Sequence, residues 1–154
     1  MGYPSPEAQN KQLWSSLQLG FMVARAGEVL PDTTAQSIFT LAGGAVRLYL
    51  LGRVTTVMDA TATNLKVTHN PTAGTSFDLA ANAVITSDEV NTCYGLPPVM
   101  GAALLVGGQC VNLHPVVIQG PGTIDIETDA TQTGAVAWTV WYMPLDEGAT
   151  VVAA

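Results

Sequence analysis

The last third of the chain carries the pattern that most restricts its fold. In residues 122–129 isoleucines alternate with acidic residues, and in residues 135–144 the valines, Trp138 and Tyr142 fall on one face. A period of two with β-branched and aromatic side chains is typical of strands that bury one face. The polar stretch at residues 131–134 predicts a turn between them. We therefore expect a β-hairpin packed on a core.

Short β-rich segments recur along the rest of the chain, at intervals typical of an all-β sandwich or barrel. They lie at residues 21–24, 37–41, 45–59, 64–70, 77–79, 83–86, 99–106 and 116–119, and residues 148–154 suit a last edge strand or a loose end. Within the longest of them, Gly52 predicts a bulge or bend. The expected fold is all-β, a single β-sandwich or barrel-like domain.

The first thirty residues differ from the rest. A Ser-Pro-Glu helix start is followed by a short apolar stripe of Leu13, Trp14 and Leu17. A helix this short is marginal alone, so it either docks on its own domain or acts as an arm that grips a neighbour. Trp14 favours the arm. We predict an N-terminal arm with a short helix at residues 1–30 and the β domain at residues 31–154.

Charge is scarce in this sequence. Charged residues make up 11% of the chain, against about 25% in an average globular protein. Low charge favours a surface covered by partner subunits, and the alternative is a neutral surface rich in Thr, Asn and Gln. The net charge is −7, and the five cationic residues are scattered. Direct nucleic-acid binding, which depends on clustered Lys and Arg, is not expected.

Neither a membrane span nor a targeting segment is predicted. Residues 90–124 carry no Asp, Glu, Lys or Arg, but prolines and glycines interrupt them before the roughly 18 apolar residues of a span. We expect strands and loops there, buried in the core or in a subunit interface. The first twenty residues lack the features of a signal peptide. Cys93 and Cys110 lie in apolar, Gly-rich contexts, which favours buried thiols over a disulfide.

Residue spacing predicts no enzyme, no cofactor and no metal site. No nucleophile motif accompanies the two histidines, His69 and His114. A small hydrolase would need one of them within reach of a Ser, Cys or Asp side chain, and a core or surface position is the expectation for both. The glycine pairs match no phosphate loop. Asp125, Glu127 and Asp129 share one strand face, which predicts a solvated acidic stripe rather than a calcium loop.

Turn and core motifs spread over residues 38–151 carry a family resemblance. They are Phe39-Thr-Leu-x-Gly43-Gly44, the Asn70-Pro71-Thr-x-Gly74 turn, Gly122-Thr-Ile, Gly134-x-Val-x-Trp138 and Tyr142-x-Pro144-Leu145-Asp146-x-Gly148-Ala149-Thr150-Val151. In these motifs the chain resembles small β-rich structural proteins of tailed-bacteriophage virions. The motifs hold turn and core residues rather than ligands.

The resemblance implies assembly rather than catalysis. We expect a capsid decoration (cement) protein, a homotrimer that binds the major capsid protein at capsomer junctions and resides in the virion after assembly in the host cytoplasm. The interface residues expected are Leu13, Trp14, Leu17, Phe21 and Trp141. The alternative is a tail- or fibre-associated β module that binds a host-surface glycan through Trp141, Tyr94 and Tyr49.

Overall fold

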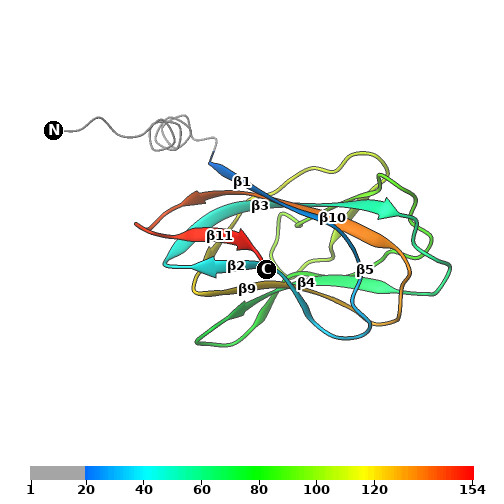
Figure 1. Cartoon of the computed structure of the whole chain (residues 1–154), viewed down its shortest axis with the longest axis horizontal. Coiled ribbons are helices and arrows are strands. Elements are labelled where there is room, and N and C mark those ends of the chain that lie inside the picture. The colour runs from blue at the N-terminus through cyan, green and yellow to red at the C-terminus, as the bar shows by residue number, and fades with distance from the viewer. Residues whose placement is uncertain (1–19) are drawn as a thin grey trace.

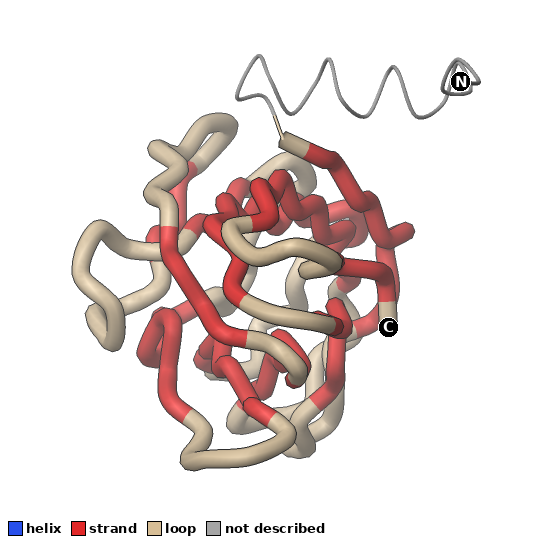
Figure 2. The backbone as a smooth tube through the Cα atoms, turned by 90° about the vertical axis from the view of Figure 1, so that its left-hand side faces the viewer, coloured by secondary structure: helices blue, strands red, loops and turns tan. Residues whose placement is uncertain are grey.

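The computed structural model describes residues 20–154, and the regular structure of that part consists of β-strands (Figures 1 and 2). The strands are β1 Phe21–Val29, β2 Gln36–Ala42, β3 Ala45–Thr56, β4 Asn64–Pro71, β5 Phe77–Val84, β6 Cys93–Gly95, β7 Leu105–Gly107, β8 Val116–Gln119, β9 Gly122–Thr128, β10 Ala135–Pro144 and β11 Thr150–Ala153. The all-β prediction is confirmed.

Two sheets pack face to face as an open sandwich. Sheet A has the order β1-β10-β3-β6-β7, with β8 also paired to β3, and sheet B has the order β11-β2-β9-β4-β5. In Figure 1, β1, β3 and β10 form one layer, and β2, β4, β9 and β11 form the other. Both sheets keep free edges, so the domain is a sandwich and not a closed barrel.

Period-2 alternation places the core between the sheets. In β10 the even-numbered residues from Val136 to Tyr142 are buried, and their odd-numbered neighbours are partly exposed. Sheet B contributes Leu65 and Val67 from β4 and Ile124 from β9. Successive side chains of a strand point to opposite faces, so each sheet keeps one face for the core and one for the surroundings.

The predicted hairpin of residues 122–144 is wrong. β9 pairs with β2 and β4 in sheet B, whereas β10 pairs with β1 and β3 in sheet A. The two strands therefore supply opposite walls of the core, and the segment between them crosses from one sheet to the other. A hairpin and such a crossover produce the same alternation of apolar residues, because each strand buries one face in both cases.

Gln132 holds this crossover in place. Its side chain is 2% exposed, and its Oε1 accepts a hydrogen bond of 2.9 Å from the Asp59 backbone N–H. Its Nε2 donates to the Thr61 carbonyl at 3.1 Å and to Thr63 Oγ1 at 3.0 Å. These bonds tie the β9–β10 connection to the β3–β4 connection, so they cross-link the same end of the two sheets.

The predicted arm boundary at residue 30 is also wrong. Phe21–Val29 form β1, an edge strand of sheet A paired along β10, and Leu30 is buried. The β domain thus begins by residue 21, and the small residues Ala24, Ala26 and Gly27 explain why its alternation is weak in the sequence. The predicted helix with Leu13, Trp14 and Leu17 lies outside the described residues.

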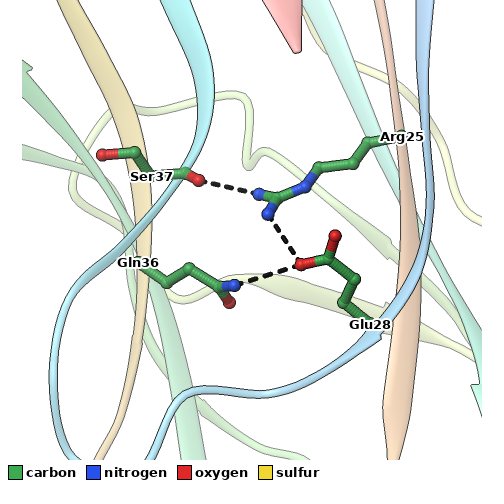
Figure 3. A network of polar contacts seen from close by, with 4 residues as sticks. All are labelled: Arg25, Glu28, Gln36 and Ser37. Atoms are coloured by element: carbon green, nitrogen blue, oxygen red, sulfur yellow. Dashed lines mark hydrogen bonds and ion pairs between the residues drawn. The ribbon is translucent and has the colours of Figure 1, made fainter. Parts of the chain in front are cut away.

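Polar contacts fasten β1 to the opposite sheet (Figure 3). Arg25 Nη1 donates to the Ser37 carbonyl at 2.7 Å, and Nη2 donates to Glu28 Oε2 at 2.7 Å. Gln36 Nε2 donates to the same glutamate oxygen at 3.2 Å. Since β1 belongs to sheet A and β2 to sheet B, this network closes the side of the sandwich.

Gly52 does not form the predicted bulge. It pairs in regular register with Trp138, and a Cβ at this position would lie 2.6 Å from Trp138 Cζ3. The glycine makes room for the indole ring on the inner face of the sheet. Its role is close packing rather than a change of strand direction.

Other differences concern strand limits. The segments predicted at 77–79 and 83–86 form one strand, β5, and the segment at 99–106 contributes only the start of β7. β6 was not predicted. Within the uncharged stretch of residues 90–124, Val99 and Met100 are 67% and 53% exposed. Burial in the core, the first of the two expectations for this stretch, is therefore wrong at Val99 and Met100, and burial in a subunit interface stays a prediction.

Candidate functional site

The outer face of sheet A carries a row of large apolar side chains. Met22 of β1 lies opposite Trp141 of β10, and Trp141 lies opposite Tyr49 of β3. Directly opposed residues of antiparallel strands point to the same side, so these three side chains are neighbours. We name this surface the Trp141 face; it consists of Met22, Arg47, Tyr49, Val117, Trp141 and Met143.

The Trp141 face is apolar and lacks acidic residues. Met22 and Val117 are 63% and 55% exposed, and Trp141 is partly buried by its neighbours. Residues 21–25, β3, β8 and β10 contain no aspartate or glutamate. Arg47 Nη2 donates to the Tyr49 hydroxyl at 3.1 Å, and its guanidinium lies 5.8 Å from the centroid of that ring. The face is therefore the candidate interaction surface of sheet A, because contiguous exposed apolar patches often are interaction sites.

The other predicted interface residue in the described chain faces inward. Phe21 is partly buried, and its ring packs 5.4 Å from that of Tyr142. Tyr142 belongs to the core face of β10. Phe21 therefore anchors the start of β1 to the core, whereas Trp141 is on the outside.

Sheet B carries a polar recess on its outer face. Its volume is about 360 Å³. The recess lies over β4, β5 and β9, and we name it the Asp125 recess. Its main polar side chains are Lys66, Thr68, Asn70, Asp78, Asp125 and Glu127.

Cross-strand pairing builds the recess. Thr68 lies opposite Asp125 on one side and opposite Asp78 on the other, and its hydroxyl donates to Asp78 Oδ1 at 3.1 Å. Lys66 forms an ion pair of 3.1 Å with Glu127 Oε2. Sequence reasoning recognised the acidic stripe but missed the recess, because Lys66, Thr68 and Asp78 come from two other strands. The alternation of polar residues in β4 is the signal that could have indicated a polar outer face.

The predicted solvated acidic stripe is wrong at its first residue, Asp125. Asp125 is only 7% exposed, and its Oδ1 has no hydrogen-bond partner. Asp129 instead accepts bonds from the backbone and side-chain nitrogens of Asn64, at 2.7 and 2.6 Å. These bonds lower the pKa of Asp129 below its usual range. The three carboxylates therefore have three different environments, although they alternate along one segment.

His69 is hydrogen-bonded to the backbone rather than to a nucleophile. His69 is buried, with Nδ1 at 3.2 Å from the Thr123 carbonyl and Nε2 at 3.0 Å from the Gln119 carbonyl. Its ring also packs edge-on against Phe77 at 5.2 Å. Both ring nitrogens thus face backbone oxygens, and the ring acts as a core cross-link. His114 is partly buried in the loop before β8.

A second recess lies at the end of the sandwich near His69. Its volume is about 510 Å³, and Phe77, Val117, Gln119 and Pro121 are among its lining residues. Of its polar groups, Gln119 Nε2 donates to the Gly120 carbonyl at 3.1 Å, and both ring nitrogens of His69 face backbone carbonyls. We assign no ligand to it.

Metal-ligand types do not converge in the part of the chain that the structure describes. Within residues 20–154 no group of three or more His, Cys, Asp or Glu side chains is arranged to hold a metal ion. Cys93 and Cys110 are both free thiols, and Cys110 is exposed. The expectation of two buried thiols is therefore wrong for Cys110, and Cys93 is only partly buried.

Tyr94 is removed from the predicted aromatic platform by its burial. It is 0% exposed, and its hydroxyl donates to Asp88 Oδ2 at 2.7 Å. Burial raises the pKa of Asp88, and the bond from Tyr94 lowers it by less. Burial also raises the pKa of Tyr94, and the bond to Asp88 and its charge add to that effect. This pair is a structural link between β6 and the preceding loop.

Like Gln132, Asp59 links the β3–β4 connection to the β9–β10 connection. Its Oδ1 accepts from the Thr61 backbone N–H at 2.8 Å, and its Oδ2 accepts from the N–H and hydroxyl of Thr133, both at 3.1 Å. Hydrogen bonds from Thr61, followed by those from Thr133, lower the pKa of Asp59 from the usual 3.8 to about 2. The ionised carboxylate is therefore the form that the fold favours.

The stability of the protein should therefore depend on the ionisation of Asp59 at acidic pH. A depressed pKa contributes stability above the unfolded value of 3.8, and that contribution is lost as the pH falls toward the folded value of about 2. Asp59→Asn should lower the melting temperature at neutral pH and flatten its decline between these two values. Thermal unfolding over this pH range measures the effect. Glu147→Gln, at an exposed site, is the control, and a decline in Asp59→Asn as steep as in the control would contradict the assignment.

Comparison with known proteins adds no relative: no family model, no curated protein and no solved structure matches this chain. Among the described residues, no helix is long and apolar enough to cross a membrane.

Proposed function

We propose that this chain is a structural protein of a tailed-bacteriophage virion, and specifically a capsid decoration protein. In this proposal it forms a homotrimer that binds the major capsid protein where capsomers meet. The observation that carries the proposal is the Trp141 face, where Met22, Trp141 and Tyr49 form one apolar row across three strands. The motif resemblance supplies the virion context.

The scarcity of charge supports assembly through this face. Exposing Trp141 and Met22 to water is unfavourable, and burying them against a protein partner removes that cost. Interface cores are rich in aromatic residues and Met and poor in acidic residues. The Trp141 face has this composition, and its only charged side chain is Arg47, which interface cores also tolerate well.

Sedimentation tests the oligomer. We expect the purified protein to sediment at about three times the 16.0 kDa mass of one chain, and Trp141→Glu to sediment as a folded monomer, because the new carboxylate would be buried without a partner. Val99→Glu is the matched control, since it places the same charge on an exposed apolar residue outside the face. A monomeric wild type, or a trimer that survives Trp141→Glu, would rule out assembly through this face.

Purified phage particles test whether the protein is part of the virion head. In virions of the phage that encodes the chain, we expect the protein to copurify with heads rather than tails. Heads that lack it should release their DNA at a lower temperature, and adding back the purified protein should restore them. A version that begins at Gly20 examines the predicted arm and should trimerise but bind heads more weakly. Absence of the chain from particles would refute the virion proposal.

A glycan-binding module is the second candidate, because Trp141 and Tyr49 lie directly opposite each other on the outer face. Two neighbouring aromatic rings can form a platform for a sugar. Under this alternative the wild type is a monomer, and Trp141→Ala abolishes binding on a glycan array while the protein remains folded. Under the decoration proposal the array shows no binding.

A further inference from the structure

The Asp125 recess contains more negative charge than its own partners neutralise. Its charged side chains are Lys66, Asp78, Asp125 and Glu127. The ion pair between Lys66 and Glu127 matches one cation with one carboxylate. Asp78 receives only a neutral hydroxyl bond from Thr68. Two carboxylates, those of Asp78 and Asp125, therefore remain without a cation.

Asp125 is the unusual member. Its side chain is more than nine-tenths buried, and Oδ1 has neither a hydrogen-bond partner nor measurable contact with solvent. Buried carboxylate oxygens are almost always paired, because removing them from water without compensation is unfavourable. Asp125 also lines an open recess, so a turn of its side chain toward the opening would bring Oδ1 to a ligand that enters from outside.

The position of Asp125 relative to Asp78 restricts the ligand. Both residues lie opposite Thr68, on the two strands that flank β4. Since neighbouring strands are about 4.8 Å apart, the backbones of the two aspartates are separated by roughly 10 Å. At that spacing, one small ion can contact both carboxylates only if both side chains extend toward it. A larger planar group with several N–H donors fits the space between the two carboxylates better.

We propose that the Asp125 recess binds a guanidinium group, presented by an arginine of a protein partner. The guanidinium has five N–H donors in a fixed fork, and two of them can bond one carboxylate in parallel. Asp125 is the primary acceptor in this arrangement, and Asp78 lies on the far side of the group. The side-chain oxygen of Asn70 already accepts a bond from Ser76 at 2.7 Å, and it borders the same opening.

A divalent cation fits the recess less well. Calcium takes six to eight oxygen ligands, several of them carboxylates. The described residues place no three acidic, His or Cys side chains together for such an ion, and the Lys66 ammonium in the recess would repel it. The recess lies on sheet B, away from the Trp141 face, so its test does not depend on the proposed assembly.

Two sources could present the arginine. Arg53 is exposed on sheet A and lies outside the Trp141 face, so a second copy of this chain is one source. A different protein, such as the shell to which the chain is proposed to bind, is the other. The chemistry in the recess is the same for both, and dilution separates them.

Two-dimensional NMR of the isotopically labelled full chain tests the site. Methylguanidinium chloride is the probe, and calcium chloride is titrated separately. We expect methylguanidinium to shift the amide signals of Thr68, Asp78 and Asp125 saturably. Asp125→Asn should weaken this binding about tenfold or more, as expected for the loss of a charge-assisted hydrogen bond. Glu147→Gln removes the same charge at an exposed site and should bind as the wild type does.

Three results would overturn the proposal. They are the absence of saturable shifts, binding to Asp125→Asn as tight as to wild type, and saturable shifts with calcium but not with methylguanidinium. The spectrum of Asp125→Asn also reports whether it folds, and Asp78→Asn, from the far side of the recess, provides the test if it does not. If a second copy is the source, dilution of the wild type shifts the same signals, and Arg53→Gln abolishes that shift. If another protein is the source, dilution has no effect.

Discussion

Trp138→Ala is expected to lower the free energy of unfolding by about 3 to 5 kcal/mol, the usual range when a large aromatic residue is removed from a core. Trp138 is 2% exposed, packs over Gly52 and lies 6.4 Å from the ring of Tyr94. Both neighbours belong to strands whose pairing is fixed on each side, so they cannot collapse into the cavity. Urea denaturation followed by far-ultraviolet circular dichroism measures the loss.

Gly52→Ala probes the same contact from the other side. Its new Cβ would lie 2.6 Å from Trp138 Cζ3, and this overpacking should cost about 1 to 3 kcal/mol. In the Trp138→Ala background the same change should cost much less, because the clashing ring is gone. Gly108→Ala is the control, since a Cβ there meets nothing within 4 Å. Additive effects of the two substitutions would show that they do not act through this contact.

Gln132→Leu is expected to lower the free energy of unfolding by about 3 kcal/mol. The substitution keeps most of the volume but leaves the Asp59 N–H and the Thr61 carbonyl without their partner. An unsatisfied buried polar group costs about 1 to 3 kcal/mol, and here more than one is affected. The same denaturation measurement applies, with amide exchange at Asp59 as a local report of the lost bond.

Gln109→Leu is the matched control for this prediction. It makes the same chemical change at an exposed position in the loop after β7, so stability should change by less than about 0.5 kcal/mol. If Gln132→Leu were no more destabilising than Gln109→Leu, the crossover between the sheets would not depend on this side chain. The placement of β9 and β10 in different sheets would then depend on the pairing of these strands alone.

The two large effects have different origins. Trp138 lies on the inner face of β10, where loss of volume determines the cost. Gln132 lies in a connection, where loss of hydrogen bonds determines it. Both positions nevertheless serve one purpose, because they hold β10 in sheet A while β9 remains in sheet B.

The sequence alone determined the fold class and the inward face of most strands. Alternation is a local property, since each strand residue points to the side opposite its neighbour regardless of which strands flank it. This is why the pattern in residues 135–144 correctly placed Trp138 in the core and Trp141 on the outside. The β4 and β8 segments were likewise located from their own residues.

Only the tertiary structure decided which strands pair and which polar residues become buried. β9 lies between β2 and β4 rather than beside β10, because partners distant in the chain and the bonds of Gln132 outweigh proximity in sequence. The same pairing brings Thr68 and Asp78 to Asp125, buries that carboxylate and forms the recess. Burial and charge balance depend on neighbours from other strands, so they cannot be predicted from the segment in which a residue lies.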